Sequence, residues 1–310
     1  MNVNMKVTIG NLTLKNPVTV ASGTFGYGEE YSEYFDISCL GAVTVKSLTL
    51  KPRLGNPPPR IVETPAGMLN AIGLQNVGLE VYLKEKLPYL RQKKCTIIAN
   101  IYGTSIQEYE ELAERLEKEG GADAIEMNLS CPNVHDARSR YKCPLVAQSP
   151  EWVEKYTMAV RSKIKLPLIV KLSPNVTDIT EPAISAEKGG ADAISIINTL
   201  LGMSIDIKTQ KPKLKNVVGG LSGPAIRPVA VKMVWDVSRT VKIPVIGMGG
   251  ICTVNDALEF IFAGAKLIAV GSFIFRDPLA PIKIIQGLEE YCNSHRIEDI
   301  NKLIGSVIIS

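Results

Sequence analysis

Several features that reveal the location or the bound group of other proteins are missing from this chain of 310 residues. No stretch approaches the roughly 18 consecutive apolar residues of a membrane span, and residues 1–17 lack the apolar run of a signal peptide. The six cysteines form neither a Cys-x-x-Cys pair nor a cluster, so their spacing predicts no metal site and no iron–sulfur cluster. We therefore expect a soluble cytoplasmic protein with free thiols and no contact with a membrane.

A strong charge of one sign and a nucleotide-binding glycine motif are also absent. Lys and Arg number 35 against 31 Asp and Glu, and the basic residues are spread along the chain without interleaved aromatic residues, which argues against a nucleic-acid partner. Gly-x-Gly-x-x-Gly does not occur between a strand-like and a helix-like segment, and the glycines of residues 23–28 have the wrong spacing for it. If electrons reach a nicotinamide, we expect another chain to take part.

The chain does contain a regular alternation of two kinds of segment. Short runs rich in Val, Ile and Ala are typical of buried parallel strands, and several are separated by stretches with helical spacing of apolar residues, at 106–119, 151–165, 225–241 and 254–263. This alternation predicts an α/β fold, a (β/α)8 TIM barrel that forms a single domain over residues 1–310. The eight strand-like runs are 18–21, 42–45, 96–99, 124–127, 168–170, 194–197, 244–247 and 267–270.

Polar or glycine residues follow these runs at the ends that meet at the mouth of a barrel. Because the carboxyl ends of barrel strands carry the chemistry in this fold, these residues are candidates for a site. Capping of strands and helices is the structural alternative, but six successive polar ends exceed what a purely structural barrel needs. The candidates are Ser22, Lys46, Asn100, Asn128, Lys171, Asn198, the turn at 247–250, and Gly271 with Ser272.

Two of the connections between strands are long. The first covers residues 47–94 and includes the segment 64–76, and the second covers residues 198–224 and ends in Gly-Gly-Leu-Ser-Gly at 219–223. Long ordered loops on barrels usually cover a ligand, so we expect both connections to cover the carboxyl-terminal mouth.

Glycines and lysines at the predicted mouth indicate the kind of ligand. Gly249-Gly250 and Gly271-Ser272 follow the seventh and eighth strands, where backbone N–H groups bind phosphate in barrels, and Gly223 adds a third contact. Glycines also mark ordinary turns, but both pairs together predict a bound phosphate. Lys46 and Lys171 beside carboxamides suit a flavin, because a fixed positive charge stabilises the reduced ring. A lysine at such a position could equally form a Schiff base.

The most informative segment is Asn128-Leu-Ser-Cys-Pro-Asn133, which places a thiol and two carboxamides just past a strand. Cys131 is either a small buried hydrophobe, as most unpaired cysteines are, or a reactive thiol presented to a flat polar ring. Together with several other segments, this hexapeptide resembles the dihydroorotate dehydrogenase family over nearly the whole chain. The other segments are Lys46-Ser47, 68–76, 171–178, 197–199, 219–225 and 247–250.

The resemblance is most detailed for one branch of that family. Cysteine at position 131 resembles class 1, and the segments 171–178 and 206–216 look like the NAD-linked subclass. This resemblance implies a catalytic subunit that binds FMN, forms a homodimer and pairs with an iron–sulfur, FAD-containing electron-transfer subunit. It also implies oxidation of (S)-dihydroorotate to orotate in pyrimidine biosynthesis, with hydride passing to flavin N5, Cys131 as the base and Lys46 as a second catalytic residue.

The resemblance also implies which residues contact each ligand. Asparagine side chains carry both donor and acceptor atoms, so they can form hydrogen bonds with the edge of a pyrimidine, and a lysine ammonium can pair with a carboxylate. The expected FMN contacts are Ser22, Lys46, Ser47, Asn100, Asn128, Lys171, Ile197, Gly223, Gly249, Gly250, Gly271 and Ser272. The expected substrate contacts are Lys46, Asn70, Ala71, Ile72, Gly73, Leu74, Asn128, Asn133, Asn198 and Thr199.

The chain departs from the family pattern after Asn133. Residues 134–150 contain no glycine where family members usually have a glycine-rich lid, and they bring His135 and Cys143 near Cys131 in sequence. We interpret this segment as a solvated basic loop, not as a Cys–His pair or a disulfide. Three alternatives for the chain are a dihydropyrimidine dehydrogenase, a Schiff-base lyase barrel using Lys171, and a barrel that has lost catalysis and serves as a scaffold.

Overall fold

A closed barrel of parallel strands forms the centre of the computed structural model, which describes residues 3–130 and 146–309. The strands follow the order β3-β16-β15-β10-β9-β8-β7-β4, and a parallel bridge between Thr19 and Ala42 joins the two ends of that order. The predicted (β/α)8 barrel is therefore confirmed. Its strands are β3 (Val18–Val20), β4 (Val43–Thr44), β7 (Ile97–Ile101), β8 (Ala124–Asn128), β9 (Leu168–Lys171), β10 (Ala193–Ile196), β15 (Val245–Met248) and β16 (Ala265–Val270).

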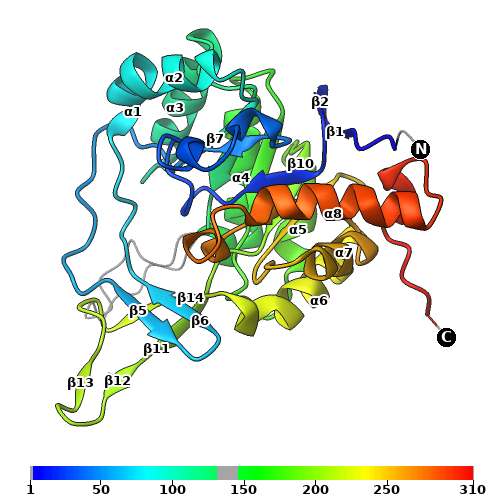
Figure 1. The fold of residues 1–310 in the computed structure, drawn as a ribbon. Helices are drawn as coiled ribbons and strands as arrows, with labels where there is room; N and C mark the ends of the chain where they lie inside the picture. The colour runs from blue at the N-terminus through cyan, green and yellow to red at the C-terminus, as the bar shows by residue number, and fades with distance from the viewer. Residues whose placement is uncertain (1–2, 131–145, 310) are drawn as a thin grey trace.

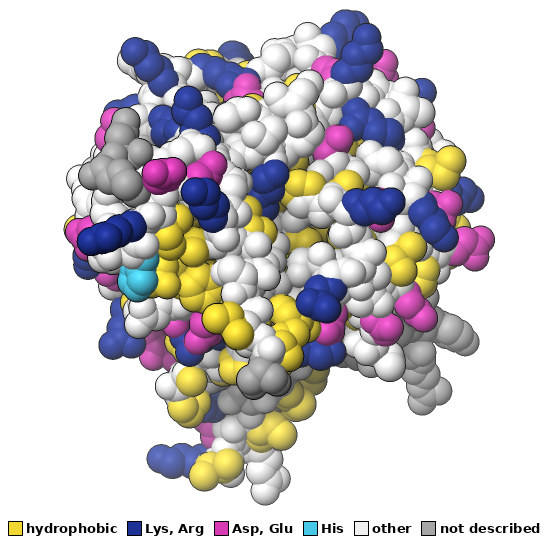
Figure 2. Space-filling view, turned by 90° about the vertical axis from the view of Figure 1, so that its right-hand side faces the viewer, with side chains coloured by type: hydrophobic (Ala, Val, Ile, Leu, Met, Phe, Trp, Pro, Cys, Tyr) yellow, Lys and Arg dark blue, Asp and Glu magenta, His cyan; other side chains and the backbone are white. Residues whose placement is uncertain are grey.

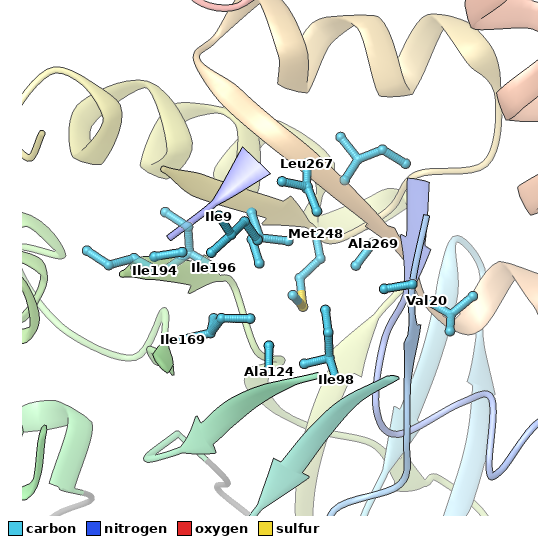
Figure 3. Close-up of a cluster of buried hydrophobic side chains, with 14 of the residues drawn as sticks. Ile9, Val20, Ile98, Ala124, Ile169, Ile194, Ile196, Met248, Leu267 and Ala269 are labelled. Carbon is cyan, nitrogen blue, oxygen red and sulfur yellow. The ribbon is translucent and has the colours of Figure 1, made fainter. Parts of the chain in front are cut away.

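Side chains that point inward from alternate strand positions fill the barrel. Figure 3 shows Ile98, Ala124, Ile169, Ile194 and Leu267 pointing toward one another, and all are almost inaccessible to solvent. The strands are buried on both faces, because helices cover their outer sides, and this explains why they appear in the sequence as continuous apolar runs.

Helices surround the barrel (Figure 1). α3 begins after Ser105, whose hydroxyl accepts a hydrogen bond from the backbone of Glu108, and α7 begins with a capping box formed by Thr253 and Asp256. The predicted helix 225–241 is in fact a short turn, η6 (Pro224–Ile226), followed by α6, and the helix predicted at 151–165 ends earlier, at Arg161. The outer helices are α3 (Ile106–Lys118), α4 (Pro150–Arg161), α5 (Thr180–Lys188), α6 (Arg227–Ser238), α7 (Val254–Phe262) and α8 (Ala280–Ser294).

The two long connections meet in a second sheet outside the barrel. This four-stranded antiparallel sheet, which we call the cap sheet, has the order β11-β14-β6-β5 and lies at the lower left of Figure 1. The first connection supplies β5 (Ile61–Thr64) and β6 (Gly67–Asn70), and also carries α1 (Gly78–Val81), η3 (Tyr82–Lys86) and α2 (Leu87–Gln92). The second supplies β11 (Leu200–Met203), β14 (Val218–Ser222) and a projecting hairpin of β12 (Ile205–Asp206) and β13 (Lys211–Pro212).

The amino-terminal segment closes the opposite end of the barrel. The hairpin of β1 (Val7–Ile9) and β2 (Leu12–Leu14) places Ile9 among the barrel's inward-pointing residues (Figure 3). Asp299, near the other terminus, accepts hydrogen bonds from the side chains of Asn4 at 3.0 Å and Asn301 at 2.7 Å. Burial alone would raise the pKa of Asp299, but these bonds and the backbone N–H of Asn301 outweigh it and hold the pKa below its usual value.

The surface shows no concentration of one charge on the face drawn in Figure 2, where basic and acidic side chains are interspersed. Among the helices of the described residues, none combines the length and the apolar character that crossing a bilayer requires.

Candidate active site

A pocket with a volume of about 340 Å³ lies at the carboxyl-terminal mouth of the barrel. Its floor and walls come from strand ends, including Ser22, Lys46, Asn128 and Lys171, and its cover comes from the cap sheet. Met248 reaches the pocket from β15 and also belongs to the apolar interior (Figure 3). The pocket therefore rests directly on the packed core, as the strand-end rule for barrels predicts.

The structure brings nearly all of the predicted site residues to this one pocket. Asn100 and Ala71 do not line it: Asn100 is buried within β7, and Ala71 packs in a small apolar cluster with Leu69 and Leu214. Cys131 and Asn133, like His135 and Cys143, lie outside the described residues. The predicted residues that line the pocket are Ser22, Lys46, Ser47, Asn70, Ile72, Gly73, Leu74, Asn128, Lys171, Ile197, Asn198, Thr199, Gly223, Gly249, Gly250, Gly271 and Ser272.

Hydrogen bonds hold the amide side chains of the floor in place. Asn128 donates to the Ser47 hydroxyl at 3.4 Å, and its Oδ1 accepts from the Ser130 hydroxyl at 3.0 Å. Ser130 in turn accepts from the Asn198 amide at 2.9 Å. These hydrogen bonds fix the carboxyl end of β8, after which the sequence continues to Cys131. Tyr109 of α3 supports it from behind, because its hydroxyl donates to the Asn128 carbonyl oxygen at 2.7 Å.

The two lysines differ in their surroundings. Lys46 Nζ donates to the carbonyl oxygen of Gly23 at 3.3 Å. The side chain of Lys171 is only 5% exposed and lies 3.8 Å from a carboxylate oxygen of Glu126, which is itself buried. Glu126 was not among the predicted site residues. A charged residue inside the apolar run 124–127 was the signal that could have revealed it, since a buried carboxylate needs a partner.

Glycines let the backbone face the pocket near its far wall. Gly223, Gly249 and Gly250 have φ values of +104°, +126° and +78°, which side chains rarely adopt, and a Cβ at Gly250 would approach the Gly223 carbonyl oxygen to 2.7 Å. A Cβ at Gly23, in contrast, would meet no described atom within 4 Å. Burial raises the pKa of the nearby Cys252 thiol, despite the opposing charges of Arg227 and Arg276, so this thiol stays protonated at neutral pH.

Sequence reasoning also missed several residues that the cap and the loops bring to the pocket. Arg60, Met68 and Gln75 come from the first long connection, and Phe275 comes from the turn after β16. Arg60 donates to the side chain of Gln75 and to the carbonyl oxygen of Asn56, so its charge is held at the rim. Met68 and Gln75 belong to the segment 68–76 that carries part of the family resemblance, whereas Arg60 and Phe275 have no local signal and reach the pocket only through the packing of distant segments.

Fold and pocket together define a protein of the (β/α)8-barrel class with a pocket lined by lysines, asparagines and glycines at the carboxyl-terminal mouth. Residues 4–292 match the family model described as dihydroorotate dehydrogenase. The chain belongs to the dihydroorotate dehydrogenase family.

Similar proteins cover nearly all of the chain. It is 52% identical over 302 residues to the protein named dihydroorotate dehydrogenase B (NAD(+)), catalytic subunit, of Thermodesulfovibrio yellowstonii, covering 97% of this chain and 98% of that protein. It is also 52% identical over 307 residues to the protein of the same name from Trichlorobacter lovleyi, covering 99% of each. The crystal structure of DHODH from Eimeria tenella in complex with ferulenol has the same fold, with a TM-score of 0.81 over 98% of this chain and 88% of that chain at 24% identity.

Proposed function

We propose that this chain is the catalytic subunit of an NAD-linked dihydroorotate dehydrogenase and oxidises (S)-dihydroorotate to orotate in pyrimidine biosynthesis. The observation that carries the proposal is the pocket at the barrel mouth, where two lysines, a set of asparagines and a glycine-rich wall face the same space. The family membership and the names of the similar proteins support it. We also propose that the whole chain works as one domain, because both long connections contribute to this pocket.

The residues of the pocket fit FMN as the cofactor. Gly249 and Gly250 line the pocket just before the turn that leads into α7. The φ values of both glycines exclude most side chains, so a phosphate could approach the backbone closely at this wall. Lys171 and Asn128 would face the polar edge of the ring, and Ser22 and Gly271 line the same pocket. When bound, FMN supplies the acceptor for the hydride.

Residues from the strand ends and from the cap sheet together fit the substrate. Lys46 carries the charge that would bind the carboxylate of dihydroorotate, and Asn70, Asn128 and Asn198 offer donors and acceptors to its ring edge. Asn70 is held by a hydrogen bond of 3.3 Å to the Gly220 carbonyl oxygen, within the cap sheet. Because the Asn70 side chain is already oriented, less conformational entropy is lost when a ligand binds.

Cys131 is the proposed base that removes a proton from C5 of the substrate. It follows Ser130, whose position is fixed by Asn128 and Asn198. A free thiol has a pKa of about 8.5, so turnover should rise with pH through that region. Cys131→Ala should keep the flavin and lose turnover by roughly 10²- to 10⁴-fold. Cys131→Ser is the matched control of similar size. Retained turnover of Cys131→Ala at high pH would remove this residue from the mechanism.

The surroundings of Lys171 argue against the Schiff-base alternative. An amine that attacks a carbonyl carbon must be free to approach it, but the Lys171 side chain is only 5% exposed and its Nζ lies 3.8 Å from the Glu126 carboxylate. Borohydride trapping with a carbonyl ligand should therefore leave Lys171 unmodified.

The activity is tested most directly by the flavin spectrum. The purified protein, reconstituted with FMN, should be yellow and should bleach when dihydroorotate is added without oxygen. Dihydrouracil should bleach it much more slowly, because it lacks the carboxylate that Lys46 would bind. A protein that takes up no flavin, or that bleaches equally with both substrates, would contradict the proposal.

Electrons should leave through a partner. We propose a homodimer that pairs with an iron–sulfur, FAD-containing subunit, since the similar proteins are named catalytic subunits. The chain alone should then reduce an artificial dye with dihydroorotate but should not reduce NAD at a comparable rate. All four cysteines in the described part of the chain are free thiols, which supports the proposed cytoplasmic location.

A further inference from the structure

A buried carboxylate lies one layer beneath the floor of the pocket. Side chains at alternate positions of a strand point to the same face, so Ala124, Glu126 and Asn128 of β8 all point into the barrel. Ala124 belongs to the apolar interior (Figure 3), and Asn128 lines the pocket. Glu126 therefore lies between the apolar core and the ligand space, with 3% of its surface exposed.

Neighbouring strands provide the partners of this carboxylate. On β7, Asn100 is paired with Glu126 in the strand register, and its amide donates to Glu126 Oε1 at 2.5 Å. On β9, Lys171 Nζ lies 3.8 Å from the same oxygen. A buried carboxylate without partners would be strongly destabilising, and these two contacts compensate it.

Lys171 connects the buried Glu126 carboxylate to the pocket. It lines the ligand space, and its side chain is 5% exposed, so little water screens its charge. A lysine ammonium alone next to a flavin would stabilise the reduced, anionic ring and raise its reduction potential. The Glu126 carboxylate, 3.8 Å from this ammonium, would oppose the effect, because its negative charge offsets part of the field of the lysine.

We propose that Glu126 is a positioning residue that orients Lys171 and lowers the reduction potential of the flavin bound above it. This inference rests on the proposed function, in which electrons leave the flavin toward NAD. A flavin that is too easily reduced would keep those electrons, so the buried pair favours their onward transfer. Asn100 holds Glu126 Oε1 in place through its hydrogen bond and does not itself line the pocket.

The test is the midpoint potential of bound FMN in Glu126→Gln, a substitution that removes the charge and keeps the shape. The potential should become more positive by the equivalent of about a tenfold change in the reduction equilibrium, or about 30 mV for two electrons. Affinity for sulfite, which adds to the flavin and is favoured by nearby positive charge, should rise in parallel. Glu111→Gln, which removes an exposed carboxylate on α3, should change neither quantity.

A second pair of variants keeps the test decisive if Glu126→Gln does not fold. Lys171→Gln should lower the potential, and adding Glu126→Gln to it should raise the potential again, because the double variant buries no charge. A flavin-loaded Glu126→Gln or double variant whose potential and sulfite affinity match those of its parent would overturn the inference about Glu126. A wild-type protein that binds no FMN would instead overturn the proposed function, so the two failures are distinguishable.

Discussion

Gly220 in the cap sheet offers a sharp test of the proposal that the cap helps to position the substrate. It lies on β14, paired with Asn70 of β6 on one side and with Leu201 of β11 on the other. A Cβ at this position would lie 1.9 Å from Thr199 Oγ1 and 2.6 Å from Thr199 Cβ. Gly220→Ala therefore forces Thr199 to move, and Thr199 lines the pocket.

The size of the effect follows from these distances. Non-bonded heavy atoms pack at about 3.5 Å or more, so Thr199 has to shift by roughly 1.5 Å. Overpacking of this kind costs about 1–3 kcal/mol of stability. A displacement of about 1 Å at a binding residue can cost about 100-fold in rate. We expect kcat/KM for dihydroorotate to fall by about 10- to 100-fold, with unchanged FMN content, because the proposed cofactor contacts lie elsewhere in the pocket.

The assay compares steady-state reduction of a dye acceptor with the ratio of flavin to protein absorbance. Gly202→Ala is the matched control in the same sheet, because its Cβ would lie 3.0 Å from Leu69 Cδ2, the far end of a flexible side chain, and 3.8 Å from Leu221 Cβ, an ordinary contact distance. This control should keep kcat/KM within about twofold of wild type, as expected for a change near 0.5 kcal/mol. A folded Gly220→Ala protein with wild-type kcat/KM would refute the assignment of Thr199 to the substrate side.

Three further outcomes follow from single contacts. Tyr109→Phe should lose about 1–2 kcal/mol of unfolding free energy in urea and lower turnover, because the buried carbonyl of Asn128 loses its donor; unchanged stability would contradict this role. Burial, with a smaller contribution from Asp36, raises the pKa of the Cys95 thiol to about 11. An alkylating reagent at pH 8 should therefore modify the exposed Cys39 but should not modify Cys95 until the protein unfolds, and mass mapping can show this difference. Folding lowers the pKa of Asp299, so this carboxylate stabilises the protein above about pH 4, and the contribution is lost as the pH falls through the pKa of the folded state. The difference in urea midpoint between wild type and Asp299→Asn should therefore shrink as the pH is lowered over that range.

The barrel was predictable because its strands depend on short-range information. Each run of Val, Ile and Ala is buried on both faces, so composition alone marks it, and all eight predicted runs coincide with barrel strands to within one or two residues. The strand-end rule then placed residues such as Lys46, Asn128 and Lys171 at one mouth, since all parallel strands end on the same side. Helices α5 and α8 were not among the segments singled out. α5 has a weak apolar stripe, as does α6, which was predicted, and α8 follows the last strand of the barrel.

The sequence by itself determined the architecture and the end of the barrel where the pocket lies, because strand burial is a local property and strand direction follows from the repeated βα unit. Only the tertiary structure decided the rest of the pocket. The cap sheet joins Asn70 to Gly220, 150 positions away, and this pairing carries no local signal. The contact of Glu126 with Lys171 depends likewise on the register of neighbouring strands. Such contacts are decided by which distant segments pack together, and the physical reason is that packing and charge compensation act through space and not along the chain.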